Sequence, residues 1–191
     1  MRLTLMRHGE PARGNLDASD PPLAESGRAQ ARGAVRYVLA RGVDRLYCSP
    51  QRRARETAQI IGDALGRAPI EDDGLVEFDY GTPYVHYDDG QASVWRHYDA
   101  GDLSPWGLTA ETFHARIRST IDRLAQRHSG ERVLSVCHGG VINAWTCQVL
   151  GIPERIQVIA PSYASLHRYA LEGGRWRLLS LNETAPVDLD R

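Results

Sequence analysis

An arginine, a histidine and a glycine stand together directly after a short apolar run near the start of the chain. The run over residues 3–6 is typical of a buried strand, and Arg7, His8 and Gly9 follow it. In an open α/β sheet, ligands bind beyond the carboxyl ends of the strands, and a glycine there lets the backbone approach a ligand closely. Because a guanidinium offers a planar fork of donors and an imidazole is a nucleophile, the pair suits phosphate chemistry. One such tripeptide alone is more typical of a solvated loop.

A second histidine occupies the same setting far down the chain. Residues 132–136 form a nearly continuous apolar run that is followed by Cys137, His138, Gly139 and Gly140, and a helix is expected over residues 141–150. Two strands that each lead into a His-Gly pair predict two histidines at one edge of a sheet.

Arginines gather where a third strand ends. The strand expected over residues 43–48 ends at Ser49, and a helix is expected from Pro50 to Gly66 with Arg52, Arg53 and Arg55 at its start. The helix macrodipole disfavours cations at this end, so an anion bound there would explain the cluster. Arg52 and Arg55 are expected to point into water, and one inward arginine is enough for an anion site.

Helices and strands alternate along the chain. Further helices are expected from Leu23 to Gly42 and from Thr109 to His128, and two late strands over residues 165–171 and 175–181 join through Gly173 and Gly174. This order predicts an α/β fold, a three-layer αβα sandwich whose central sheet is mostly parallel with an antiparallel edge.

Residues 67–108 are the least regular part of the chain and hold half of its aromatic residues. No clean period runs through them. A long irregular segment in a compact domain is typical of a lid or a binding insert, and equally of aromatic side chains that pack beneath a long connection. The two interpretations are compatible and both stay open.

Composition excludes several classes of function. The chain of 191 residues carries a net charge of -1 and 42% hydrophobic residues, which favours one globular domain over residues 1–191 and gives no sign of nucleic-acid or membrane partners. Three cysteines without CxxC spacing, and no signal peptide, favour a reduced cytoplasmic protein. No HExxH, Walker or GxGxxG motif is present, so neither a metal nor another cofactor is expected. A homo-oligomer is compatible with the sequence, which does not fix the oligomeric state.

Five motifs occur in the order found in one family. The chain resembles the histidine phosphatase superfamily, the phosphoglycerate mutase-like proteins, from residue 1 to about residue 145. The motifs are Leu-Met-Arg-His-Gly-Glu at 5–10, Pro-Leu-Ala-Glu-Ser-Gly-Arg-Ala-Gln-Ala at 22–31, Ser-Pro-Gln-Arg-Arg-Ala-Arg-Glu-Thr-Ala at 49–58, Leu-Val-Glu at 75–77 and Val-Cys-His-Gly-Gly at 136–140.

The resemblance implies roles for particular residues. His8 would attack the phosphoryl group and become a phosphohistidine, and Glu77 would protonate the leaving oxygen and then activate water. The phosphoryl oxygens would be bound by Arg7, Arg53 and His138, together with the helix amides that begin at Gly139. The family often has an asparagine six residues after the nucleophile. This chain has Gly14 there, and Asn15, one place later, is the candidate for that phosphate contact.

Alternatives remain at the level of both residues and function. Asp79 and Glu10 are other candidates for the acid, and the neighbours of Arg53 could replace it. The expected function is a metal-independent phosphomonoesterase that acts on a small phosphorylated metabolite, with a variable lid or specificity segment at about residues 78–108. The alternatives are a cofactor-dependent phosphoglycerate mutase, a protein phosphohistidine phosphatase and a noncatalytic phosphate-binding module.

Overall fold

The computed structural model describes residues 1–14, 19–86 and 92–185, and for Ala92 and Ser93 only the backbone. Strands and helices alternate along these residues. In chain order they are β1 (Arg2–Arg7), α1 (Glu25–Arg41), β2 (Arg45–Cys48), α2 (Arg52–Leu65), β3 (Ile70–Glu71), the 3-10 turn η1 (Asp73–Leu75), α3 (Ala92–Asp99), η2 (Ser104–Trp106), α4 (Ala110–Arg127), β4 (Arg132–Cys137), α5 (Gly139–Leu150), β5 (Leu166–Glu172) and β6 (Arg175–Glu183).

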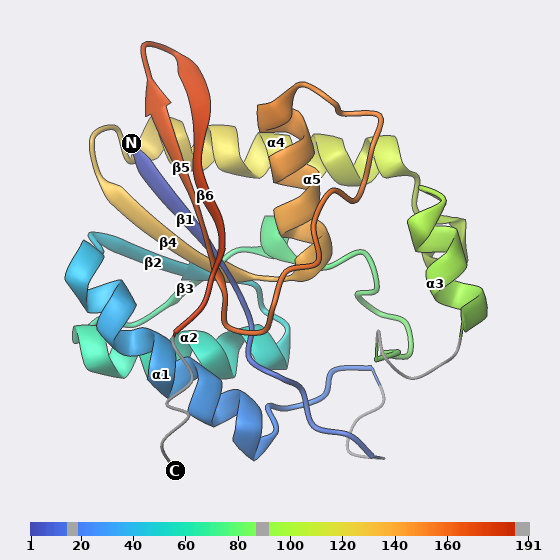
Figure 1. The fold of residues 1–191 in the computed structure, drawn as a ribbon, viewed down its shortest axis with the longest axis horizontal. Helices are drawn as coiled ribbons and strands as arrows, with labels where there is room; N and C mark the ends of the chain where they lie inside the picture. Colours follow the sequence, from blue (N-terminus) through green and yellow to red (C-terminus); the bar gives the residue numbers. More distant parts are fainter. Residues whose placement is uncertain (15–18, 87–91, 186–191) are drawn as a thin grey trace.

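The strands form one six-stranded sheet in the order β3-β2-β4-β1-β5-β6. The pairs β3·β2, β2·β4 and β4·β1 are parallel, whereas β5 runs antiparallel to both β1 and β6. Figure 1 shows α1 and α2 along one face of the sheet and α4 and α5 along the other. The predicted three-layer α/β fold with an antiparallel edge is confirmed.

Alternate side chains of the central strands pack into two separate cores. On β1, Leu3 and Leu5 belong to the core under α4 and α5, whereas Met6 belongs to the core under α1 and α2. On β4, Val133 faces the first core and Leu134 the second. Burial on both faces explains why these strands read as continuous apolar runs rather than as alternating ones.

The structure corrects two of the predicted helix boundaries. Helix α5 begins at Gly139, two residues earlier than expected, with His138 as its N-cap residue. Helix α2 begins at Arg52, after Pro50, and both carboxylate oxygens of Asp20 accept the backbone N–H of Arg52. This carboxylate offsets the cations at the helix start, which the sequence did not reveal because Asp20 is distant along the chain.

The irregular segment contains more regular structure than its sequence pattern predicts. Strand β3, helix α3 and two 3-10 turns all lie within residues 67–108. The aromatic rings of Trp95, Tyr98 and Trp106 pack around Phe78, which also contacts Phe113 on α4. Ring packing between distant residues stabilises this segment, so no local period marks it.

The carboxyl ends of β1, β2 and β4 lie side by side because these strands are parallel and adjacent (Figure 1). Each strand therefore delivers the residues that follow it to the same edge of the sheet. These residues are Arg7 and His8 from β1, Ser49 to Arg53 from β2, and His138 from β4.

Two glycines let the loop after β1 touch helix α1. A Cβ atom built on Gly9 would stand 2.3 Å from the carbonyl oxygen of Gly27, and one built on Gly27 would stand 2.1 Å from that of Glu10. Real side chains do not approach a backbone this closely. The contact fixes the loop that follows His8 against the helix.

Gly27→Ala should lower the free energy of unfolding by about 1–3 kcal/mol, because the added methyl group displaces the loop backbone. Gly33→Ala is the matched control on the same helix, where the nearest atom is 3.8 Å from the added Cβ. That variant should be stabilised by roughly 0.5–1 kcal/mol through helix propensity. Urea unfolding measures both, and equal effects of the two substitutions would contradict the close approach.

Candidate active site

His8 is held in one orientation and one tautomer. Its side chain is buried, and Nδ1 lies 2.7 Å from the carbonyl oxygen of Gly9, so Nδ1 carries the proton and donates it. Nε2 is then unprotonated, and its lone pair accepts from Nε of Arg53 at 3.3 Å. Burial and the cations Arg53 and Arg7 lower the pKa of His8. The imidazole is therefore neutral, as a nucleophile must be.

Arg53 is the inward arginine of the cluster at the start of α2. Its side chain is 1% exposed, whereas the side chains of Arg52 and Arg55 are 45% and 48% exposed. Its Nη2 donates to Asp79 Oδ1 at 3.2 Å, and its guanidinium carbon lies 4.5 Å from the centre of the Tyr84 ring. The sequence predicted that Arg52 and Arg55 point into water and that Arg53 binds the phosphoryl group. The exposed fractions of the three side chains agree with this prediction.

Several buried nitrogens at the site lack a hydrogen-bond partner within the described part of the chain. They are the donors Arg7 Nε and Arg53 Nη1 and the two ring nitrogens of His138, of which one is a donor in the neutral ring. Arg53 Nη1 does lie 3.8 Å from Asp20 Oδ1, which is an ion pair without a hydrogen bond. Buried donors are normally satisfied, so such a group indicates a place for an anion that accepts from them.

Arg7 and His138 flank His8. Arg7 donates through Nη1 to the carbonyl oxygen of Pro161 and lies over the ring of Tyr163, 4.1 Å from its centre. The His138 ring is fully buried behind His8, with 5.1 Å between ring centres, and it is not among the residues that line the pocket. Burial and the nearby Arg53, His8 and Arg7 lower the pKa of His138, so it is neutral while no anion is bound.

The amino end of helix α5 also lies beside Arg7. Its first residue, Gly139, lines the pocket, and a Cβ built there would lie 3.8 Å from Arg7 Nε. Unpaired amides and the helix dipole favour negative charge at this end.

Glu77 is a buried carboxyl group with an unusual proton affinity. Its Oε2 accepts the backbone N–H of Gly140 at 2.7 Å, and its Oε1 accepts that of Phe78 at 3.0 Å. Burial and the negative charge of Asp79 outweigh these bonds and raise the pKa of Glu77 to about 7. A group with this pKa donates and accepts a proton near neutral pH. Gly140 permits the contact, since a Cβ there would stand 2.3 Å from Glu77 Oε1.

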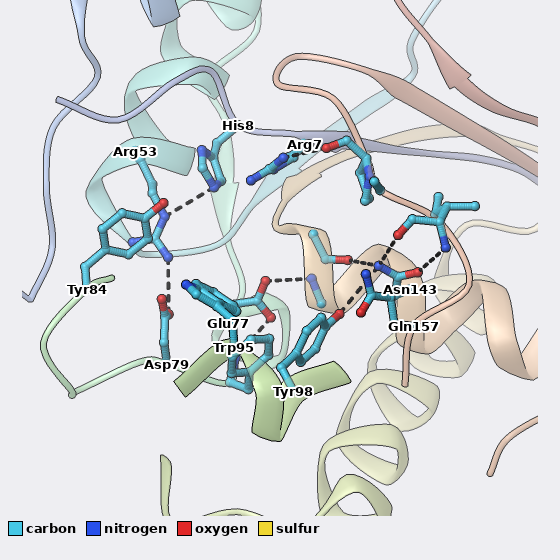
Figure 2. Close-up of a pocket in the computed structure, with 16 residues that line it drawn as sticks. Arg7, His8, Arg53, Glu77, Asp79, Tyr84, Trp95, Tyr98, Asn143 and Gln157 are labelled. Carbon is cyan, nitrogen blue, oxygen red and sulfur yellow. Dashed lines mark hydrogen bonds and ion pairs between the residues drawn. The ribbon is translucent and has the colours of Figure 1, made fainter. Parts of the chain in front are cut away.

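The groups described above surround one pocket, which Figure 2 shows in close-up. It holds about 610 Å³ of empty space, the part open to solvent included. Two walls come from Phe78, Asp79 and Tyr84 and from Trp95 and Tyr98 of α3. The segment from Gln157 to Pro161 supplies a third wall, which sequence reasoning did not predict.

Asn143 holds this third wall in place. Its Oδ1 accepts the backbone N–H groups of Val158 and Ile159 at 2.9 and 3.0 Å, and its Nδ2 donates to the carbonyl oxygens of Ile159 and Gly139. A polar residue between the apolar pairs Val141-Ile142 and Ala144-Trp145 of α5 was the sequence signal that could have identified it.

Gln51 was also missed, although it connects two of the predicted catalytic segments. Its side chain is 1% exposed, and its Oε1 accepts the backbone N–H of Glu77 at 2.7 Å while its Nε2 lies 3.3 Å from Asp79 Oδ1. Gln51 is also the N-cap residue of the helix that carries Arg53. No pattern in the sequence marks this role, because its partners are 26 and 28 residues away.

The structure brings together five of the predicted site residues and Gly139. His8 has Arg7, Arg53 and His138 beside it, and Glu77 lies across the pocket from it (Figure 2). Asn15 lies outside the described residues, so its predicted phosphate contact stays a prediction.

The two alternative acids occupy other positions. Asp79 lines the pocket but is paired with Arg53. Glu10 accepts from the Ser26 hydroxyl at 2.6 Å and does not line the pocket. Glu77, by contrast, lies in the pocket wall, accepts from two backbone N–H groups and has a raised pKa.

The cysteine side chains do not line this pocket. The three cysteines are buried and unpaired, and burial raises the pKa of Cys137 above its usual range. Among the residues that the structure describes, no three His, Cys, Asp or Glu side chains form a group that could hold a metal ion. Likewise, no helix in the described ranges has the length and apolar character to cross a membrane.

Comparison with known proteins gives a consistent result over nearly the whole chain. A profile described as the histidine phosphatase superfamily (branch 1) matches residues 3–184. A putative phosphoserine phosphatase 2 of Hydrogenobacter thermophilus is 30% identical over 95% of both chains. A probable phosphoglycerate mutase GpmB of Yersinia enterocolitica is 25% identical over 99% of this chain and 96% of its own.

A solved structure shows the same fold. It is a mutant phosphoserine phosphatase of Entamoeba histolytica in complex with phosphoserine, which superposes with a TM-score of 0.76. The match covers 95% of this chain and 96% of that one at 19% identity, so the likeness concerns the fold.

The raised pKa of Glu77 predicts a pH-dependent difference in stability. A carboxyl group whose folded pKa lies above its unfolded pKa contributes stability below about pH 4.5 that is lost as the pH rises through 7. Relative to wild type, Glu77→Gln should therefore gain up to about 3 kcal/mol of unfolding free energy between pH 4.5 and pH 8. Urea unfolding of both proteins at several pH values measures this, and a difference that does not change with pH would contradict the assignment.

Proposed function

Because the chain belongs to branch 1 of the histidine phosphatase superfamily, we propose that it hydrolyses small phosphomonoesters through a phosphohistidine formed on His8. The observation that carries this proposal is the unprotonated Nε2 of His8, which lies among buried nitrogens that lack partners in the described part of the chain. A nucleophile surrounded by unsatisfied donors matches a phosphoryl group, which needs attack at phosphorus and neutralisation of its oxygens.

The first step transfers the phosphoryl group to the histidine. Nε2 of His8 attacks phosphorus while the bond between phosphorus and the ester oxygen breaks. Glu77, protonated in part at neutral pH because its pKa is about 7, gives its proton to the departing oxygen. The products of this step are the free alcohol, phosphohistidine and the Glu77 carboxylate.

The second step returns the enzyme to its starting state. The Glu77 carboxylate takes a proton from water, whose oxygen attacks phosphorus as the bond to His8 Nε2 breaks. Inorganic phosphate leaves, His8 is again neutral and Glu77 is again protonated. One group with a pKa near neutrality thus serves as acid in the first step and as base in the second.

The remaining site residues bind the charge of the phosphoryl oxygens. Arg7 and Arg53 offer Nε and Nη1, which have no hydrogen-bond partner in the described part of the chain, and α5 offers its amino end at Gly139. A bound dianion opposes the effects that lower the pKa of His138, so phosphate binding favours its protonated form, with two donors. Asn15 remains the candidate for a further contact.

The segment at about residues 78–108 is proposed to set substrate specificity. Its residues Asp79, Tyr84, Trp95 and Tyr98 stand on the pocket wall beyond His8. A small substrate also accords with the phosphoserine bound to the Entamoeba histolytica protein. Phosphoryl transfer of the phosphoglycerate mutase type is the second candidate, because relatives at 25% identity carry that name.

The protein should hydrolyse an aryl phosphate in EDTA, and His8→Ala should lower the rate to background, since His8 is the group proposed to form the covalent intermediate. Rapid quenching of the wild type should trap an acid-labile phosphoprotein. Arg52→Ala is the matched control, because Arg52 points into solvent and pairs with Glu56. Turnover that requires added metal, or that survives in His8→Ala, would overturn the mechanism, and phosphate exchange between sugar acids without release would support the mutase instead.

Glu77→Gln should slow alkyl phosphates far more than aryl phosphates. Loss of a general acid costs about 10²- to 10⁴-fold when the leaving oxygen needs its proton, and less when the leaving group is stable as an anion. Single-turnover measurements of both ester classes give the ratio, with phosphohistidine formation followed directly. Equal losses on both classes would assign Glu77 to a role other than proton donor.

A further inference from the structure

The pocket extends well past the groups proposed to hold the phosphoryl group. In Figure 2, Arg53 and Gln157 lie at opposite ends of it, with Arg7 and Glu77 between them. The leaving alcohol must occupy the end near Gln157, because Arg53, Arg7 and His8 take the phosphoryl end. The composition of that far end therefore decides which alcohols fit.

No cation stands at the far end among the residues that the structure describes. Arg7 and Arg53 are the cationic side chains of the described pocket wall, and both are assigned to the phosphoryl group. Arg116, on α4, donates instead to the carbonyl oxygen of Val76 and does not line the pocket. By sequence, residues 15–18 and 87–91 contain no lysine, arginine or histidine, and the one cation outside the described ranges is Arg191 at the end of the chain.

The far end carries apolar surface in place of a cation. Phe78, Trp95 and Ile159 contribute apolar surface to the pocket, and Asp79, which also lines it, is paired with Arg53 at the phosphoryl end. A carboxylate on the leaving group would lose water at the far end and find no counter-ion there. An uncharged alcohol avoids each of these costs.

Gln157 is the polar group that remains available to such an alcohol. The other amide on this wall, Asn143, is fully used by Gly139, Val158 and Ile159. The Tyr98 hydroxyl is engaged by Asn143 and the Ile156 carbonyl. The half-buried Gln157 side chain has no hydrogen-bond partner within the described ranges, so its amide is free to pair with a hydroxyl group.

We propose, on the basis of the phosphatase activity inferred above, that the substrate is the phosphate ester of an uncharged hydroxyl-bearing alcohol and that Gln157 binds its hydroxyl group. This separates the chain from relatives named for acidic substrates, phosphoserine and phosphoglycerate. The shared phosphoryl machinery explains the family likeness, whereas the far wall sets the leaving group.

Glycerol 3-phosphate and 3-phosphoglycerate test the charge directly, because they differ in a hydroxymethyl group against a carboxylate. The wild type should show a kcat/KM at least about tenfold higher for glycerol 3-phosphate, the cost of one poorly placed polar group. An aryl phosphate serves as the reference for intact phosphoryl chemistry. Absence of aryl phosphate turnover would overturn the phosphatase proposal and this one together, whereas normal aryl turnover with 3-phosphoglycerate preferred would overturn this one alone.

Two substitutions test Gln157 itself. Gln157→Leu should lower the ratio of kcat/KM for glycerol 3-phosphate to that for the aryl phosphate about tenfold, because the contact to the substrate hydroxyl is lost. Gln157→Arg should raise the ratio of 3-phosphoglycerate to glycerol 3-phosphate by about tenfold or more through a new counter-ion. Equal losses on all three esters in both variants would show a structural role and overturn the assignment.

Discussion

The close packing of two guanidinium groups and two imidazoles in a buried place is the constraint on which this structure depends. Arg53 is 1% exposed, and burial together with the nearby Arg53 and Arg7 guanidinium groups lowers the pKa of both His8 and His138. Such a set is costly unless rigid surroundings hold it. Parallel strands β1, β2 and β4 and the start of α5 provide those surroundings, because they meet at one edge of the sheet.

Asp79 links the two halves of the chemistry. It pairs with Arg53, which contacts His8, and its charge also raises the pKa of Glu77. Gln51 reaches both Asp79 and the backbone of Glu77 from the loop that leads to Arg53. The nucleophile and the proton donor are thereby held by one buried hydrogen-bond network, in which each member depends on the geometry of the others.

The phosphoryl end and the leaving-group end of the pocket have different origins in the fold. The first comes from strand ends and a helix start, whose geometry follows from the sheet. The second comes from α3 and from residues 157–161, which Asn143 fastens to α5. Connecting segments vary more freely than the sheet they connect, so relatives with the same phosphoryl site can differ in the alcohol that they accept.

The layered fold and the grouping of Arg7, His8, Arg53 and His138 near one edge of the sheet could be predicted from the amino-acid order, whereas Glu77 was implied by the family resemblance. Apolar runs and the residues that follow them are local signals in the sequence. Because the strands are parallel and adjacent, they bring those residues to one edge of the sheet. Three features became visible only in the folded chain. Gln51 accepts the backbone N–H of Glu77, Asp20 accepts that of Arg52 at the start of α2, and Gln157 lines the pocket together with residues from other elements. They join residues far apart in the chain and follow no period, so they exist only once the packed elements bring both partners together.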